Sequence, residues 1–211
     1  AALKNIIGKE AMRFQFLLES ERLSKAEKDS YQRLIKIGTT SESIYDMTDA
    51  TLIDSLQTLS QLLEKHYGQK VILLIDEYDV PLDKAFQDGY YDEMVNLIRN
   101  LFANVLKTND SLYFAVLTGC LRISKESIFT GFNNLKVHTI SDIRYDEYFG
   151  FTNTDVDELL EFYGLYSYKS VIQDWYDGYR FGETDVYCPW DVFNYCDELL
   201  AAPGIPPKNY W

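Results

Sequence analysis

The 211-residue sequence has few cysteines and histidines, the residues from which disulfide frameworks, zinc sites and many catalytic centres are built. Its three cysteines, Cys120, Cys188 and Cys196, are odd in number and widely spaced, and no Cys-x-x-Cys pair occurs. This pattern supports neither a disulfide framework nor a zinc site, and it is typical of reduced thiols. With only His66 and His138, the sequence supports no Ser-His-Asp or Cys-His catalytic arrangement.

Basic residues are also scarce, with 20 Lys and Arg against 33 Asp and Glu and a net charge of −13. Non-specific binding of duplex DNA depends on basic side chains that neutralise phosphates, so the composition disfavours it. No apolar run approaches the roughly 18 residues of a membrane span. We therefore expect a cytoplasmic protein without a membrane partner. The chain is 46% hydrophobic, enough to bury the core of one domain with an appendage.

The most informative stretch is Val-Ile-Leu-Leu-Ile at residues 71–75, followed directly by Asp76 and Glu77. A continuous apolar run of this length predicts a strand buried on both faces, as in the parallel sheet of an α/β protein. Such sheets place their chemistry at the carboxyl ends of the strands. A strand that ends in Asp-Glu has the pattern of the Walker B element of P-loop NTPases. Alternatively, the acids simply leave the sheet for water and cap the next segment.

Hydrophobic periodicity predicts further elements on both sides of this strand. Ser24 and Glu27 form a capping-box pattern that predicts a helix start, and Gly68 is well placed to end the helix that precedes it. The alternation of helices and strands predicts an α/β fold, a parallel sheet flanked by helices over residues 1–144, with a small, mainly helical subdomain over 145–211. The expected helices cover 24–37, 50–67, 91–105, 124–129, 154–163, 169–176 and 190–200. The expected further strands cover 112–117 and 137–140, and the expected loops cover 81–89 and 177–182.

Three stretches together resemble one family. They are residues 73–82 (Leu-Leu-Ile-Asp-Glu-Tyr-Asp-Val-Pro-Leu), residues 117–135 with Leu-Thr-Gly-Cys-Leu-Arg-Ile-Ser at their start, and residues 175–190, with Trp-Tyr-Asp-Gly-Tyr-Arg-Phe-Gly near their start. The chain is similar to the bacterial AAA-ATPase-like family, whose members are predicted P-loop ATPases of the AAA-like type. A PD-(D/E)XK nuclease-like domain usually follows in the same polypeptide. The resemblance implies a partial P-loop NTPase sheet that works with ATP and Mg²⁺.

The resemblance also implies roles for single residues. Asp76 would be the Mg²⁺-side carboxylate and Glu77 the catalytic base that activates water, with Asp79 either supporting them or capping the next loop. Thr118 ends the next strand, where this type of ATPase places a polar sensor of the γ-phosphate; a plain turn residue is the alternative. Arg122 lies just beyond and would stabilise phosphate charge, with a solvated surface residue as the alternative.

One departure from the family pattern is a missing phosphate-binding loop. The sequence contains no Gly-x-x-x-x-Gly-Lys-Ser/Thr, and Gly8-Lys9 is followed by Glu10 instead of a hydroxyl residue. The chain therefore looks like a central fragment of a longer protein. We expect ATP and Mg²⁺ to be cofactors of the intact protein, with none bound to this fragment, which should not hydrolyse ATP. Any contact with nucleic acid would come through the nuclease-like domain.

Loss of the P-loop strand has a structural consequence and leaves other functions open. Sheet edges without a neighbouring strand tend to pair with other chains. We expect the gap left by the missing strand to be closed by rearrangement, by a partner chain such as a second copy that associates through the exposed edges, or by partial disorder around residues 136–142. The main rival to an ATPase is a catalytically idle interaction scaffold with an NTPase-like fold. A metal-dependent hydrolase built on Asp76, Glu77 and Asp79 is a third hypothesis. The aromatic run between Trp175 and Trp190 predicts a packed core more than a platform for stacking nucleic-acid bases.

Overall fold

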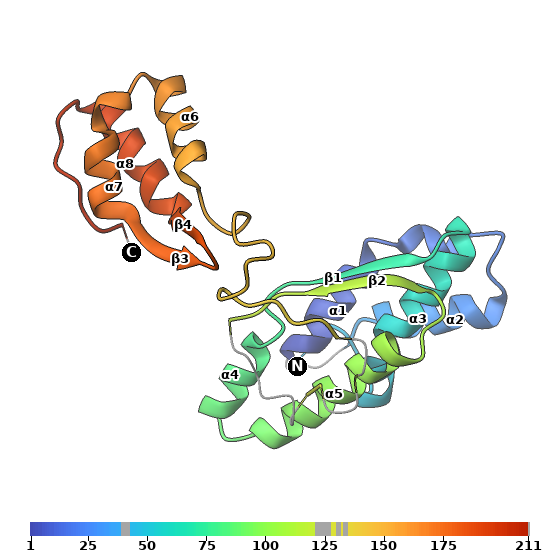
Figure 1. Cartoon of the computed structure of the whole chain (residues 1–211). Helices are drawn as coiled ribbons and strands as arrows, with labels where there is room; N and C mark the ends of the chain where they lie inside the picture. Colours follow the sequence, from blue (N-terminus) through green and yellow to red (C-terminus); the bar gives the residue numbers. More distant parts are fainter. Residues whose placement is uncertain (39–42, 121–127, 130–131, 133–134, 211) are drawn as a thin grey trace. The chain divides into compact units, whose positions relative to one another are not determined.

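The computed structural model describes residues 1–38, 43–120, 128–129, 132 and 135–210 (Figure 1). The chain divides into two compact units, Ala1–Asn134 and Leu135–Trp211. Each unit buries apolar clusters of its own, two in the first unit and one in the second. The boundary expected from the sequence, between residues 144 and 145, lies further along the chain than this division. No helix in the described ranges has the length and apolar character that crossing a membrane requires.

The first unit begins with three helices whose ends follow local sequence signals. The Ser24 hydroxyl accepts a hydrogen bond from the Glu27 amide, and the Glu27 carboxylate accepts one from the Ser24 amide at 2.7 Å, which confirms the predicted capping box. The third helix ends at Gly68, which has the left-handed φ of 72° expected of such a cap. These helices are α1 (Ala2–Met12), α2 (Lys25–Ile35) and α3 (Asp49–Tyr67), with a short 3₁₀ helix at Gln15–Glu19.

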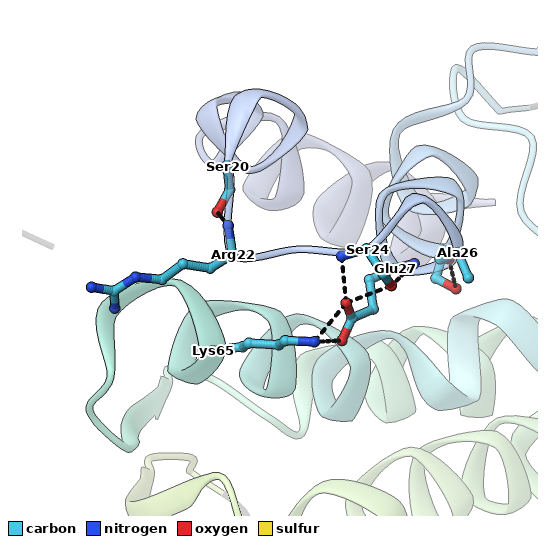
Figure 2. Close-up of polar contacts among 7 residues, drawn as sticks. Ser20, Arg22, Ser24, Ala26, Glu27 and Lys65 are labelled. Atoms are coloured by element: carbon cyan, nitrogen blue, oxygen red, sulfur yellow. Dashed lines mark hydrogen bonds and ion pairs between the residues drawn. The ribbon is translucent and has the colours of Figure 1, made fainter.

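An ion pair joins the start of α2 to the last turn of α3, as Figure 2 shows. The Lys65 ammonium lies 2.7 and 2.8 Å from the two carboxylate oxygens of Glu27. The same carboxylate caps α2, so Glu27 serves two elements at once. The hydrogen bond from Lys65 and then those from Ser24 lower the pKa of Glu27 from 4.5 to about 2. This ion pair adds to the apolar contacts between the two helices, where Tyr31 and Leu34 of α2 pack in one cluster with Leu59 and Leu62 of α3.

The sheet of the first unit consists of two parallel strands, β1 (Val71–Ile75) and β2 (Leu112–Leu117), which lie side by side in Figure 1. Both strands were predicted. The predicted burial on both faces of β1 is wrong, because Ile72 is 57% and Leu74 is 72% exposed while the alternate residues are half-buried. Helices α3 and α5 (Tyr91–Lys107) pack beside the strands, and no element in the described ranges covers the opposite, apolar face.

Two other expectations for this region are wrong. Residues 81–89, expected to be a loop, are mostly helical and belong to α4 (Val80–Gln87). Pro81 is compatible with this helix because it lies in the first turn, where its missing backbone N–H removes no hydrogen bond. Residues 137–140 do not form a strand, and Val137 and Ile140 are exposed. A strand needs a neighbouring strand for a series of backbone hydrogen bonds, whereas the described residues show a single one here between segments, from the Gly182 amide to the Ile140 carbonyl at 2.8 Å. The helix expected at 124–129 falls almost entirely outside the described residues.

The second unit is three helices and a hairpin around one core. The helices are α6 (Asn153–Tyr163), α7 (Lys169–Tyr176) and α8 (Pro189–Ala201), and the antiparallel strands are β3 (Asp177–Phe181) and β4 (Thr184–Tyr187). A short 3₁₀ helix covers Tyr166–Tyr168. The three helices were predicted, but the expected turn-rich link at 177–182 is a strand that turns at Gly182. The core contains Val156, Leu160, Leu165, Ile172, Tyr176, Tyr187, Val192, Tyr195, Cys196 and Leu199.

The aromatic run of this unit is only partly core. Tyr176 and Tyr187 are buried, as predicted, and the Tyr176 hydroxyl donates to the Lys208 carbonyl at 2.9 Å. Trp175, Tyr179 and Trp190 are more than half exposed. Periodicity explains the split, because only the side chains on the inner face of each element reach the core.

Candidate functional site

The candidate site lies where the two parallel strands end. The register pairs Ile75 with Leu117, so the next residues, Asp76 and Thr118, are neighbours. Backbone hydrogen bonds continue past the strands: the Thr118 amide donates to the Ile75 carbonyl at 2.9 Å, and the Tyr78 amide donates to the Thr118 carbonyl at 3.0 Å. The two polar strand ends are therefore held together by the backbone and do not depend on side-chain contacts alone.

The Thr118 hydroxyl connects two of the predicted site residues. It donates a hydrogen bond to the Asp76 carboxylate and accepts one from the Glu77 amide at 3.3 Å. The sequence predicted Asp76, Glu77 and Thr118 as site residues, and the structure brings all three together at one edge of the sheet. Their side chains are exposed, so ligands can reach them.

Glu77 has an unusual backbone conformation. Its φ is 52°, in the left-handed region that a residue with a side chain rarely adopts. The conformation turns the chain from β1 toward α4, and the Glu77 carbonyl accepts a hydrogen bond from the Val80 amide at 3.2 Å. Strained residues of this kind persist where surrounding structure holds them, and they cluster at functional sites. Here the held residue is the one predicted to be the catalytic base.

Asp79 differs from its two acidic neighbours because it is only 4% exposed. It occupies the N-cap position of α4, and its carbonyl accepts hydrogen bonds from the Leu82 and Asp83 amides at 2.9 and 3.2 Å. Asp79 thus holds the N-cap position through its backbone, but its side chain makes no capping hydrogen bond to α4. Its buried side chain is not presented to solvent beside Asp76 and Glu77.

Sequence reasoning missed Gly119 and Tyr78 as supports of the site. A Cβ atom at Gly119 would lie 2.7 Å from Tyr78 Cε1 and 2.8 Å from Asp79 Oδ1, closer than atoms can approach without a shift. The Tyr78 ring in turn packs edge-on against Phe129 at a centroid distance of 5.4 Å. The Thr-Gly pair after a buried strand was the available signal, because a glycine there permits a close backbone approach.

The donor set suits a magnesium ion shared with phosphate. Carboxylate and hydroxyl oxygens are hard ligands of the type that Mg²⁺ prefers, and nucleotide sites need only one or two protein carboxylates. Asp76, Glu77 and Thr118 offer such oxygens at one strand edge. Across the described ranges, no three His, Cys, Asp or Glu side chains gather as an all-protein metal site. Arg122, the predicted phosphate partner, lies outside the described residues.

Comparison with known proteins identifies the family. An α/β unit with polar residues at the ends of adjacent parallel strands is a common framework for phosphate chemistry. A family model described as predicted AAA-ATPase matches residues 5–129, more than half of the chain, and the chain belongs to this AAA-ATPase-like family. The match includes β1, β2 and the candidate site.

A curated relative extends the comparison. The chain is 37% identical over 147 residues to a protein of Azotobacter chroococcum mcd 1 that is described as an uncharacterized protein in the vnfD 5' region. The match covers 68% of this chain and 27% of the relative, so the chain corresponds to about a quarter of that protein. No solved structure matches the chain.

Proposed function

We propose that this chain carries the Walker B half of an ATPase site, and that the intact protein uses Mg-ATP hydrolysis to drive a conformational change. The observation that carries the proposal is the contact between Asp76 and Thr118 at the ends of adjacent parallel strands. Membership of a predicted AAA-ATPase family supports it. The exposed acidic side chain of Glu77 beside this pair supplies the second carboxylate that hydrolysis needs.

Each residue has a distinct role in this proposal. The Asp76 carboxylate binds the metal, and Thr118 orients that carboxylate and responds to the terminal phosphate. Glu77 accepts a hydrogen bond from the attacking water and polarises it. Arg122 stabilises charge on the phosphate oxygens. Bound Mg²⁺ supplies positive charge that neutralises the phosphates.

The 211 residues by themselves are proposed to bind ATP weakly and not to hydrolyse it. In P-loop proteins the backbone amides and lysine of the phosphate-binding loop cradle the β- and γ-phosphates, and its Ser or Thr completes the metal shell. This sequence contains no such loop. Without a loop to hold the phosphates, Asp76 has no phosphate group beside it that could bind the same metal ion.

Equilibrium binding of a fluorescent ATP analogue to the intact protein tests the metal role. The proposal predicts tight binding in the presence of Mg²⁺ that weakens at least about tenfold in Asp76→Asn, because one charged metal ligand is lost. Asp88→Asn is the matched control, since Asp88 is an exposed acid after α4 and away from the strand ends. Equal Mg²⁺-dependent binding by Asp76→Asn would contradict the assignment.

A catalytically idle scaffold is the second candidate, and the sheet supplies its support. Ile72, Leu74 and Phe114 expose an apolar face, and within the described residues each strand has one edge without a partner strand. We propose self-association through this sheet as the scaffold's mode of assembly.

Sedimentation of Leu74→Lys tests this self-association, because a charge on the apolar face should convert an oligomer to monomer. A monomeric parent would contradict the scaffold, and a complete Gly-Lys-Ser/Thr loop in the intact protein favours the ATPase.

A further inference from the structure

Helix α8 carries large apolar side chains both on its buried face and on its exposed face. Its inner face is core, with Val192, Tyr195, Cys196 and Leu199 at most 2% exposed. Its outer face carries Trp190, Phe193 and Leu200, which are spaced at i, i+3 and i+10 and are about half exposed. Asp197 shares this outer face, so the exposed apolar side chains of α8 stand beside an acid. Large apolar side chains that gather on one exposed face are typical of an interaction surface.

This outer face borders a shallow groove within the second unit. Tyr163 at the end of α6 joins Trp190, Phe193 and Leu200 in lining a volume of about 370 Å³, with the buried Cys196 at its floor. Aromatic and aliphatic walls of this kind can seat one or a few large apolar side chains. The indole nitrogen of Trp190 donates to the Tyr210 carbonyl at 3.3 Å, which fixes one wall.

The two helices that border the groove carry acidic side chains only. Helices α6 and α8 together contain seven acidic residues and no Lys or Arg, and two of these acids, Asp157 and Glu198, pair with Lys169 and Lys208 from other segments. Residues 135–211 contain 14 acidic and 5 basic residues, a net charge of −9. Glu158, Glu161 and Asp197 are exposed, and no cation pairs with them in the described part of the chain. A partner for this surface should therefore be positively charged.

We infer that this groove, which we call the α6–α8 groove, docks a basic amphipathic segment of another protein. Apolar side chains of the segment fill the groove between Tyr163 and Leu200, and its Lys or Arg residues lie over the acidic rim. A second copy of the chain is disfavoured because its own residues 135–211, with their net charge of −9, would face the same charge. Nucleic acid and anionic lipid are repelled for the same reason.

A labelled synthetic peptide of leucine and lysine, arranged to form an amphipathic helix, is the probe. Fluorescence anisotropy should show saturable binding to the chain, and Leu200→Glu should weaken it at least about tenfold because a charge then stands in the groove. Simple attraction between a basic peptide and an acidic protein predicts the opposite, since this substitution adds negative charge. Unchanged or tighter binding by Leu200→Glu would therefore overturn the proposal.

Trp175→Ala is the matched control for Trp190→Ala, because both indoles are 56% exposed and only Trp190 lines the groove. The proposal predicts that Trp190→Ala weakens peptide binding and that Trp175→Ala does not. Thermal melts of all three variants verify that the second unit remains folded. If both tryptophan variants keep the parent's melting temperature and lose peptide affinity equally, the site is not specific to the groove and the proposal is contradicted.

Two peptide controls and two alternative occupants complete the test. A scrambled peptide of the same composition lacks the apolar face, and a peptide with glutamate in place of lysine lacks the positive charge, so both should bind at least about tenfold more weakly.

A dimer that Leu200→Glu converts to monomer would assign the groove to a second copy of the chain. Binding to zwitterionic vesicles that Leu200→Glu abolishes, without peptide binding, would assign it to a lipid surface. Either result would overturn the inference.

Discussion

Thr118 donates its hydroxyl hydrogen to the Asp76 carboxylate across the two parallel strands of the first unit. Since the same hydroxyl accepts a hydrogen bond from the Glu77 amide at 3.3 Å, one side chain touches both acidic residues of the strand end. This arrangement gives Thr118 a positioning role besides that of a phosphate sensor. It also explains how an exposed carboxylate can keep one orientation before a ligand arrives.

Substitution of Thr118 tests that role. Thr118→Val keeps the shape of the side chain but removes both hydrogen bonds, and a hydrogen bond to a charged group is worth roughly 1.5–3 kcal/mol. We expect ATP turnover by the intact protein to fall at least about tenfold. Thr118→Ser keeps the hydroxyl and should retain most of the turnover. Equal losses in the two variants would show that the methyl group and not the hydroxyl matters.

Gly119→Ala should destabilise the first unit. The added Cβ would lie 2.7 Å from the Tyr78 ring and 2.8 Å from Asp79 Oδ1, and forcing an extra carbon into a packed site typically costs about 1–3 kcal/mol. Urea unfolding measures the loss. Gly38→Ala is the control in the same unit, because its Cβ would meet neighbours only at 3.4 Å or more. A Gly119→Ala variant as stable as the parent would mean that Tyr78 and Asp79 move aside freely.

The Glu27–Lys65 pair predicts a pH dependence. The folded-state pKa of Glu27 is lowered from 4.5 to about 2, so the unfolded chain binds more protons between these values. The stability that Glu27 contributes is therefore present above pH 4.5 and is lost as the pH falls toward 2. Both side chains are partly exposed, so the contribution should be about 1 kcal/mol.

Urea unfolding over this acidic range measures that dependence in the parent and two variants. Glu27→Gln keeps a capping side chain without the ionisable group, so its unfolding free energy should depend less on pH between 2 and 4.5. Lys65→Met removes the largest cause of the lowered Glu27 pKa, so its unfolding free energy should show an intermediate dependence on pH. An identical dependence on pH in all three proteins would contradict the prediction.

The cysteines should differ in reactivity. Burial raises the pKa of the Cys196 thiol to about 11, whereas Cys120 is exposed. Thiolate is the reactive form, so iodoacetamide should modify Cys196 roughly a hundredfold or more slowly than Cys120 in the native chain. Mass spectrometry of timed samples measures both rates. In urea the two rates should converge, and equal rates in the native chain would contradict the burial of Cys196.

Much of the local structure could be predicted because the signals are local. The capping box at Ser24, the glycine stop at Gly68 and a strand at residues 71–75 all appear in the structure, although only one face of that strand is covered. The sequence placed Asp76 and Thr118 at the carboxyl ends of two parallel strands. The structure adds that these strands are neighbours, which brings the two residues together. Family resemblance added their roles, which spacing alone does not provide.

The rest could not be predicted because it depends on tertiary partners. An apolar strand indicates burial on both faces, yet the exposed fraction of Leu74 depends on whether another element covers it. Pro81 reads equally well as a loop residue or as the first turn of a helix. Residues 177–182 look like a turn until β4 provides hydrogen bonds for them. Residue 119 needs to be glycine because the Tyr78 ring lies close to it, and no sequence pattern places that ring there.

The most direct test of the account is the ATP turnover of the intact protein beside its Glu77→Gln variant. Glutamine keeps the size of the side chain and removes the carboxylate that polarises water, so turnover should fall at least about a hundredfold while Mg-ATP binding is preserved. This result would establish Glu77 as the catalytic base and the β1–β2 strand ends as half of an ATPase site. A parent protein without turnover, or a Glu77→Gln variant as active as the parent, would contradict the account.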